Sequence, residues 1–188
     1  FFEHREFFMG WLATEINKAR NDAFAKGYTF SVRLNGTSDI QPEMFKYKGK
    51  VIFDVFNEVT FYDYTKVANR FKLLNKYSNY DLTYSFSGYN MLQSLELLEN
   101  NKGRVAMVFE GKQLPKTFMG YKVIDGDEYD MRHLDETGVI VGLKFKFVRT
   151  KIDTAHNKFI IPMDSKFSVY DVNPMITKAA QSKLVNVK

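Results

Sequence analysis

The stretch FSVRLNGTSD, residues 30–39, joins a short apolar run to a cluster of polar residues. The stretch VTFYDYTK, residues 59–66, has the same design. Apolar and polar residues alternate over residues 28–34, which predicts a strand. The Asn-Gly-Thr-Ser-Asp cluster behind it has the composition of a turn that leads into a helix. Each stretch therefore predicts a buried strand whose carboxyl end opens into a polar loop.

The same strand-then-helix pattern continues along the chain. Apolar runs that predict strands begin near residues 59, 81 and 104, and residues of helical periodicity fill the gaps between them. This alternation predicts parallel strands joined by right-handed crossovers. The fold that we expect is α/β, with a parallel βα-repeat sheet curled as a partial or full TIM-like barrel. An open doubly wound sheet is the alternative.

The 188 residues suit one domain with its own core. We expect an α/β barrel-like domain over residues 1–162 and a C-terminal extension over residues 163–188, where periodicity is weak. Before the first strand, residues 3–26 predict an amphipathic helix. Its expected inward face comprises Phe8, Leu12, Ile16, Ala19 and Ala23.

Composition excludes some classes of protein and leaves others open. No cysteine occurs, which excludes disulfides and thiolate metal sites within these residues. No apolar run approaches the roughly 18 residues that span a bilayer, so we expect no membrane association. The net charge of +5 is compatible with a nucleic-acid partner without requiring one. The chain begins with Phe1 rather than Met, which suggests a piece of a longer product.

The polar loops predict where a site lies, because parallel strands bring their carboxyl ends to one edge of the sheet. The residues that we expect to catalyse are Asp39, Asp63 and His133. Those that we expect to bind substrate are Arg33, Asn35, Thr37, Ser38, Lys66, Arg70, Ser85 and Lys144. Arginine suits bidentate recognition of a carboxylate or phosphate, and a structural ion pair is the equal alternative for Arg33. Helix capping is the alternative for residues 37–39.

An acidic run is the candidate metal site. The expected ligands are Asp125, Asp127 and Asp130, with Asp135 nearby, and carboxylates of this kind suit Mg²⁺ or another divalent ion. An ordinary Asp-Gly-Asp turn is the alternative. His133 lies among these acids as a base, a ligand or a structural residue. No phosphate-loop, dinucleotide or zinc-protease motif occurs, so the reaction stays open.

Several strings together resemble a family of bacteriophage and plasmid proteins related to phage "gene product 88". They are FFEHREFFM at residues 1–9, RLNGTSDI at 33–40, FYDYTK at 61–66, NR at 69–70, IDGDEYDMRHLD at 124–135, and the runs 79–85 and 138–144. The resemblance covers residues 1 to about 162. It implies a distant relationship to radical-SAM barrels, with a cysteine-bearing segment upstream. Such a segment could hold an iron–sulfur cluster or zinc near the carboxyl ends of the strands, and without it no cluster is expected.

Three functions are compatible with these observations. The first is a phage-encoded enzyme that acts on a phosphate-bearing or nucleotide-like substrate at the carboxyl edge of the strands. The second is a non-catalytic phage protein that binds nucleic acid or host machinery, through the basic residues of a predicted helix over 65–77 and through the tail. The third is a structural component of the virion. The expected location is the cytoplasm of the infected bacterial host, or the virion.

Overall fold

The computed structural model describes residues 3–146 and 157–163, which fall into two compact units. The first unit comprises residues up to Tyr64 together with Lys72–Asp81, and the second comprises Thr65–Phe71 and the residues from Leu82 onward. The predicted extension over residues 163–188 lies, except for Met163, outside the described residues. The boundary expected at residue 162 therefore stays a prediction.

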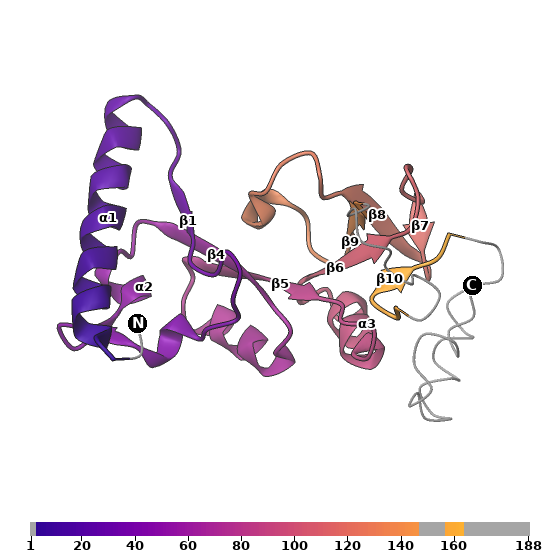
Figure 1. Ribbon diagram of the computed structural model, residues 1–188, viewed down its shortest axis with the longest axis horizontal. Helices are drawn as coiled ribbons and strands as arrows, with labels where there is room; N and C mark the ends of the chain where they lie inside the picture. Colours follow the sequence, from indigo (N-terminus) through magenta and orange to yellow (C-terminus); the bar gives the residue numbers. More distant parts are fainter. Residues whose placement is uncertain (1–2, 147–156, 164–188) are drawn as a thin grey trace. The chain divides into compact units, whose positions relative to one another are not determined.

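The first unit begins with the long helix α1 and continues with short strands (Figure 1). Its elements are α1 (Arg5–Ala25), β1 (Ser31–Arg33), the 3₁₀ turn η1 (Pro42–Met44), β2 (Lys46–Tyr47), β3 (Lys50–Val51), α2 (Ile52–Val55), β4 (Thr60–Thr65), the 3₁₀ segment η2 (Ala68–Asn75) and β5 (Tyr80–Ser85). Of these, β4, η2 and β5 lie partly in the second unit. Strands β1 and β4 pair in parallel, with Arg33 opposite Tyr62. Their carboxyl ends therefore meet at one edge, as the two polar stretches predicted.

Aromatic rings form the core of this unit. The Phe53 ring stacks on Tyr80 with the centroids 4.2 Å apart, and it meets Phe61 at 5.2 Å and Tyr77 at 5.1 Å. Asn79 lies beside them, and its Nδ2 donates to the carbonyls of the segment over residues 53–59, at 3.0–3.1 Å. Much of the high aromatic content thus serves packing, because these rings are almost fully excluded from water.

Helix α1 buries a different face from the predicted one. Met9, Ala13 and Ile16 are buried, whereas Phe7 and Trp11 are 78% and 59% exposed. The predicted face overlapped the buried one only at Ile16. Large apolar residues occur all round this helix, so periodicity alone does not fix the inward direction.

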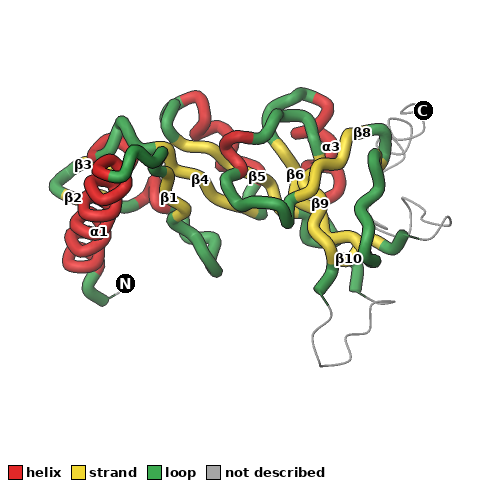
Figure 2. Tube along the Cα trace, turned by 90° about the horizontal axis from the view of Figure 1, so that it is seen from above, coloured by secondary structure: helices red, strands yellow, loops and turns green. Residues whose placement is uncertain are grey.

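The second unit is built on a mostly parallel sheet with the strand order β5-β6-β9-β8-β7 (Figures 1 and 2). Its further elements are α3 (Met91–Glu99), β6 (Arg104–Phe109), β7 (Thr117–Phe118), β8 (Tyr121–Asp125), the 3₁₀ turn η3 (Arg132–Leu134), β9 (Ile140–Lys144) and β10 (Ile160–Ile161). Within this unit the pairs β5–β6, β6–β9, β8–β9 and β6–β10 are parallel, and β7–β8 is an antiparallel hairpin. Strand β9 thus lies between β6 and β8.

The α/β class and the mostly parallel pairing agree with the sequence prediction. The described strands do not close into a barrel, and an open sheet is compatible with their order. Strand β6 begins at Arg104, as predicted, and five of its six residues are buried. None of the helices within the described ranges is both long and apolar enough to cross a membrane.

Candidate functional site

The polar loop behind β1 is organised by a contact between Asn35 and Asp63. Both side chains are buried, with exposed fractions of 4% and 1%. The Asn35 backbone N–H donates to Asp63 Oδ1 at 2.7 Å, and Asn35 Nδ2 donates to Asp63 Oδ2 at 3.1 Å. Strand β1 ends at Arg33, which lies opposite Tyr62 of β4. The loop that follows β1 therefore starts beside Asp63, the next residue of β4. The two polar clusters predicted from the sequence therefore meet.

The Asn35 carboxamide also closes residues 35–40 into a compact loop. Its Oδ1 accepts from Ser38 Oγ at 2.9 Å and from the Ile40 N–H at 3.1 Å, while its Nδ2 donates to the Ile40 carbonyl at 2.8 Å. Two donors and two acceptor positions are all that an amide side chain offers, so Asn35 is saturated by the protein itself. Its role in this geometry is to shape the loop.

Tyr80 completes the surroundings of Asp63. Its hydroxyl donates to Asp63 Oδ2 at 3.0 Å, so the carboxylate accepts from a backbone N–H, an amide and a phenol. Hydrogen bonds to an ionised acceptor are stronger than neutral ones, which makes Asp63 a firm anchor. The catalytic role predicted for Asp63 stays a prediction, but this is the geometry of a residue that positions a loop.

The outer part of the same loop carries the exposed residues. Thr37, Ser38 and Asp39 are exposed, and the space above Gly36 is open, since a Cβ added there would meet nothing within 4 Å. Arg33 is half-buried at the base of the loop, where its Nε donates to the Asn35 carbonyl at 3.2 Å. Its guanidinium lies 4.7 Å from the centre of the Tyr64 ring. A positive charge thus lies beside a hydrogen-bonded polar loop.

The remaining candidates for substrate binding belong to the second unit. Lys66 is exposed, whereas Arg70 is only 3% exposed. Ser85 is half-buried at the end of β5, and its carbonyl accepts from Asn90 Nδ2 at 3.0 Å. Of the predicted site residues, hydrogen bonds within the first unit join Arg33, Asn35, Ser38 and Asp63.

The acidic segment behind β8 is engaged by lysines of β9 and the residues after it. Lys144 Nζ contacts Asp125 Oδ2 at 2.6 Å, and Lys146 Nζ contacts Asp127 Oδ1 at 3.2 Å. Asp127 Oδ2 also accepts from the Lys144 N–H at 2.9 Å. The Lys144 ammonium and the Asp127 N–H hold the pKa of Asp125 below its usual range, and Asp125 in turn raises the pKa of Lys144.

These contacts bear on the predicted metal ion. Within residues 3–146 and 157–163, no three side chains of the metal-binding types gather as a donor set. Asp130 is exposed, and its carbonyl accepts from the Arg132 N–H at 2.9 Å. Mg²⁺ at Asp125, Asp127 and Asp130 therefore stays a prediction. An iron–sulfur cluster does not fit the residues present, because the sequence contains no cysteine.

A buried polar cluster around Arg132 was not anticipated from the sequence. Arg132 is completely buried, and its Nη1 forms an ion pair with Asp135 Oδ2 at 3.2 Å. Arg132 Nη2 donates to the Tyr129 carbonyl, and the Tyr129 hydroxyl donates to Asp135 Oδ1, which raises the pKa of Tyr129. Arg104 Nε donates to the Asp135 carbonyl at 3.1 Å. His133, the predicted base, is half-buried in the same turn.

A family model described as Gene product 88 matches residues 1–160 of the chain. The chain belongs to this family of phage proteins. No curated protein and no solved structure matches it.

The matched range includes the loop over residues 35–40, Asp63 and the buried Arg132 cluster. Arg132 and Tyr80 were missed for different reasons. An arginine three residues before an aspartate, in the segment MRHLD, is a signal for an i,i+3 pair, although such pairs usually lie on the surface. Tyr80 gave no signal, because a tyrosine at the start of a strand is ordinary.

Proposed function

We propose that this gene product 88 protein binds a phosphate-bearing or nucleotide-like ligand at the loop over residues 35–40. The observation that carries the proposal is the Asn35–Asp63 network, which holds a loop with exposed polar side chains at the carboxyl edge of two parallel strands. Ligands of open α/β sheets bind outside the carboxyl ends of the strands. A loop that is ordered in advance also reduces the entropy lost on binding.

The residue types suit such a ligand. The open space above Gly36 lets a phosphate approach the backbone, and Thr37 and Ser38 offer hydroxyl donors. The Arg33 guanidinium supplies positive charge at the base of the loop. The Asp39 carboxylate suits the sugar hydroxyls of a nucleotide or a Mg²⁺ ion carried by its phosphates. Asp39 is also the exposed carboxylate of the loop, and so it is the better catalytic candidate than the buried Asp63.

The proposal is tested by calorimetric titration of the protein with ATP and GTP, with and without Mg²⁺. Asp39→Asn and Thr37→Val should each weaken binding at least tenfold, which is ~1.4 kcal/mol. The matched control is Asp22→Asn, an exposed aspartate on α1. Circular dichroism should show that all three variants keep the wild-type fold. Absence of any nucleotide binding, or wild-type affinity in Asp39→Asn, would contradict the proposal.

The non-catalytic alternatives use other residues. Nucleic-acid binding through Lys66, Arg70 and Lys72 is weakened as a hypothesis, because Arg70 is buried. A virion component would be found by mass spectrometry of purified particles, whereas a protein of the host cytoplasm would be absent from them. The relationship to radical-SAM barrels and an upstream cysteine segment likewise stay predictions.

A further inference from the structure

The antiparallel hairpin of β2 and β3 carries three lysines that have no acidic partner. Lys46, Lys48 and Lys50 are exposed, and no carboxylate of the described residues forms an ion pair with any of them. Lys48 and Gly49 form the turn, with φ values of 49° and 79°. Two residues of positive φ make the tight turn that joins neighbouring strands. Three positive charges are therefore held within one short hairpin.

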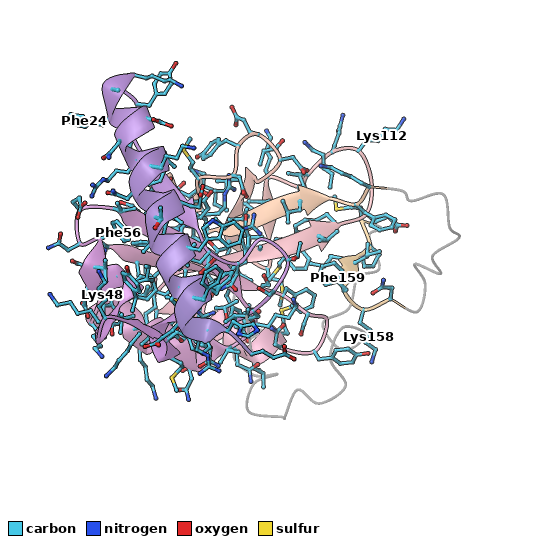
Figure 3. The ribbon with its side chains drawn as sticks, turned by 60° about the vertical axis from the view of Figure 1, so that its left-hand side comes forward. Phe24, Lys48, Phe56, Lys112, Lys158 and Phe159 are labelled. Atoms are coloured by element: carbon cyan, nitrogen blue, oxygen red, sulfur yellow. The ribbon has the colours of Figure 1, made fainter. Side chains whose placement is uncertain are left out.

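The hairpin packs on the first half of helix α1. The Tyr47 ring lies against Gly10, since a Cβ added to Gly10 would be 3.4 Å from Tyr47 Cε2. On the hairpin side, Lys48 Nζ lies 5.3 Å from the centre of the same ring (Figure 3). Nearer the start of α1, the Arg5 guanidinium lies 4.7 Å from the centre of the Phe45 ring, directly before β2. These contacts place the lysines beside the helix turn around Gly10.

Two exposed aromatic rings lie on α1 at this turn. Phe7 and Trp11 are 78% and 59% exposed, and neither ring makes an aromatic or cation–π contact within the described part of the chain. Residues four apart are neighbours on one face of a helix, and Gly10 lies between these two in the chain. The first unit thus presents exposed rings next to unpaired ammonium groups.

We propose that Phe7, Trp11 and the three lysines of the β2–β3 hairpin bind single-stranded nucleic acid. Lysines neutralise backbone phosphates, and aromatic rings stack on unpaired bases without regard to sequence. A single strand is the occupant because its charge complements the hairpin, and because a duplex hides the faces of its bases. The exposed Glu6 lies one turn before Gly10, so we expect an affinity typical of nonspecific binding, with a Kd of about 10⁻⁴–10⁻⁶ M.

This surface differs from the other sites considered above. It uses none of the residues proposed to bind a nucleotide at the loop over residues 35–40, so either proposal can fail without the other. It also uses none of the basic residues over 65–77, where the burial of Arg70 weakens the case for nucleic-acid binding.

Trp11 is the single tryptophan of the chain, so its fluorescence reports on this surface directly. Titration of the full chain with an oligothymidylate of about 20 nucleotides should quench Trp11 emission, because a base stacks on the indole ring. Three phosphate contacts predict that raising the salt from ~0.05 to ~0.2 M weakens binding roughly 20-fold. A duplex of the same length should bind more weakly, and vesicles of anionic phospholipid should leave the emission unchanged.

Replacement of all three hairpin lysines by glutamine should weaken binding about tenfold or more and remove most of the salt dependence. The matched control carries the same change of charge at exposed lysines of the second unit, and it should bind as the wild type does. Its substitutions are Lys102→Gln, Lys112→Gln and Lys116→Gln.

Phe7→Ala tests the stacking part separately, and it should weaken binding about fivefold or more. Its control on the same helix is Phe24→Ala, which is 86% exposed and lies 17 residues further along α1, about 26 Å at 1.5 Å per residue (Figure 3). Binding of the variants is measured by fluorescence anisotropy of a labelled oligonucleotide. Circular dichroism should show that every variant keeps the wild-type helix content.

Several outcomes would overturn the proposal. One is the absence of quenching by the single strand at low salt. Another is wild-type affinity in both the hairpin variant and Phe7→Ala, or an equal loss in the two control variants. A duplex that binds as tightly as the single strand, or vesicles that quench Trp11 when the oligonucleotide does not, would show that the surface has a different partner.

Discussion

Asn35 is the residue on which the shape of the candidate site depends most. It donates to Asp63 through both its backbone and its side chain, and its carboxamide closes the loop back to Ile40. Glycine follows it, which lets the chain turn without a side chain near the opening. The hydrogen bonds of Asn35 thus fix the backbone of the loop that carries the exposed residues Thr37 and Asp39.

The Asn35→Asp variant tests this dependence with a change of a few atoms. It places a second carboxylate against the buried Asp63 and removes the Nδ2 donor, so two like charges share a site of low polarity. An uncompensated buried charge costs about 3–5 kcal/mol, and we expect a loss of stability of that order at pH 7. Acidification protonates one of the two carboxyl groups and should recover part of the loss. Urea unfolding at pH 7 and at about pH 4.5 measures both effects.

Ser38→Ala is the matched control in the same loop. It removes one hydrogen bond of a part-buried pair, so it should cost only about 0.5–1.5 kcal/mol, with no recovery in acid. Equal stability of Asn35→Asp and the wild type at neutral pH would show that the Asn35–Asp63 contact does not shape the loop.

At this scale the sequence indicated that Asn35 and Asp63 lie close together, whereas their predicted roles in binding and catalysis stay predictions. Asn35 and Asp63 were singled out because both accompany the carboxyl ends of predicted strands, and the structure brings them together. Their burial was not predictable from the two stretches alone, since Tyr80 of β5 also covers this contact by donating to Asp63. Arg132 was missed because an arginine in an acidic segment usually lies in water, and only the fold encloses it with Asp135.

At the scale of elements, the strands predicted from apolar runs form, including β4 with its buried Asp63, whereas the more exposed β8 was not predicted. Strand β6 is covered on both faces, so its sequence shows no polar interruption. Strand β8 is only half-buried and ends in Asp125, which belongs to the acidic run of the sequence. The basic segment over residues 65–77 predicted a helix, and it forms the 3₁₀ segment η2 instead.

The link between β8 and β9 through Asp125 should make a small contribution to stability that depends on pH. The pKa of Asp125 lies below its ordinary value of 3.8, mainly because of the Lys144 ammonium. A carboxyl group whose pKa is lowered by folding stabilises the protein above its unfolded pKa, and the contribution disappears as pH falls through the folded value. Because the Asp125 side chain is 40% exposed, we expect about 0.2–1 kcal/mol at pH 7.

Comparison of the wild type with Asp125→Asn by urea unfolding from pH 7 down to about pH 2 measures this contribution. The difference in stability should be present at pH 7 and vanish in the acid range. Asp22→Asn on α1, which lacks the Lys144 contact, serves as the control. A difference that grows as pH falls would have the wrong sign and would contradict the assignment.

At the scale of the whole molecule, the alternation of strands and helices predicted the class, and the division into two units was not visible in the sequence. Apolar content and charge change little at the points where the chain passes from one unit to the other, after Tyr64, Phe71 and Asp81. The alternation of strands and helices also does not predict whether the sheet closes into a barrel, because the same pattern builds both barrels and open sheets.

The way the chain passes between the units predicts how they unfold. Thr65–Phe71 belongs to the second unit although both of its sequence neighbours belong to the first, and β5 begins in the first unit and ends in the second. Phe71 anchors this segment, because its ring lies 6.0 Å from that of Tyr84 and packs directly on Gly103. Phe71→Ala should therefore cost about 3–5 kcal/mol through the cavity that it leaves.

Hydrogen exchange followed by mass spectrometry shows whether that loss is local or global. Since the chain passes between the units three times, within β4, η2 and β5, we expect peptides from α1 and from β9 to lose protection together in Phe71→Ala. Phe24→Ala, an exposed position, should leave both unchanged. If β9 peptides exchange faster while α1 peptides keep wild-type protection, the units unfold independently. The family's 160 matched residues would then comprise two separately stable parts, and the loop at residues 35–40 would survive loss of the second unit.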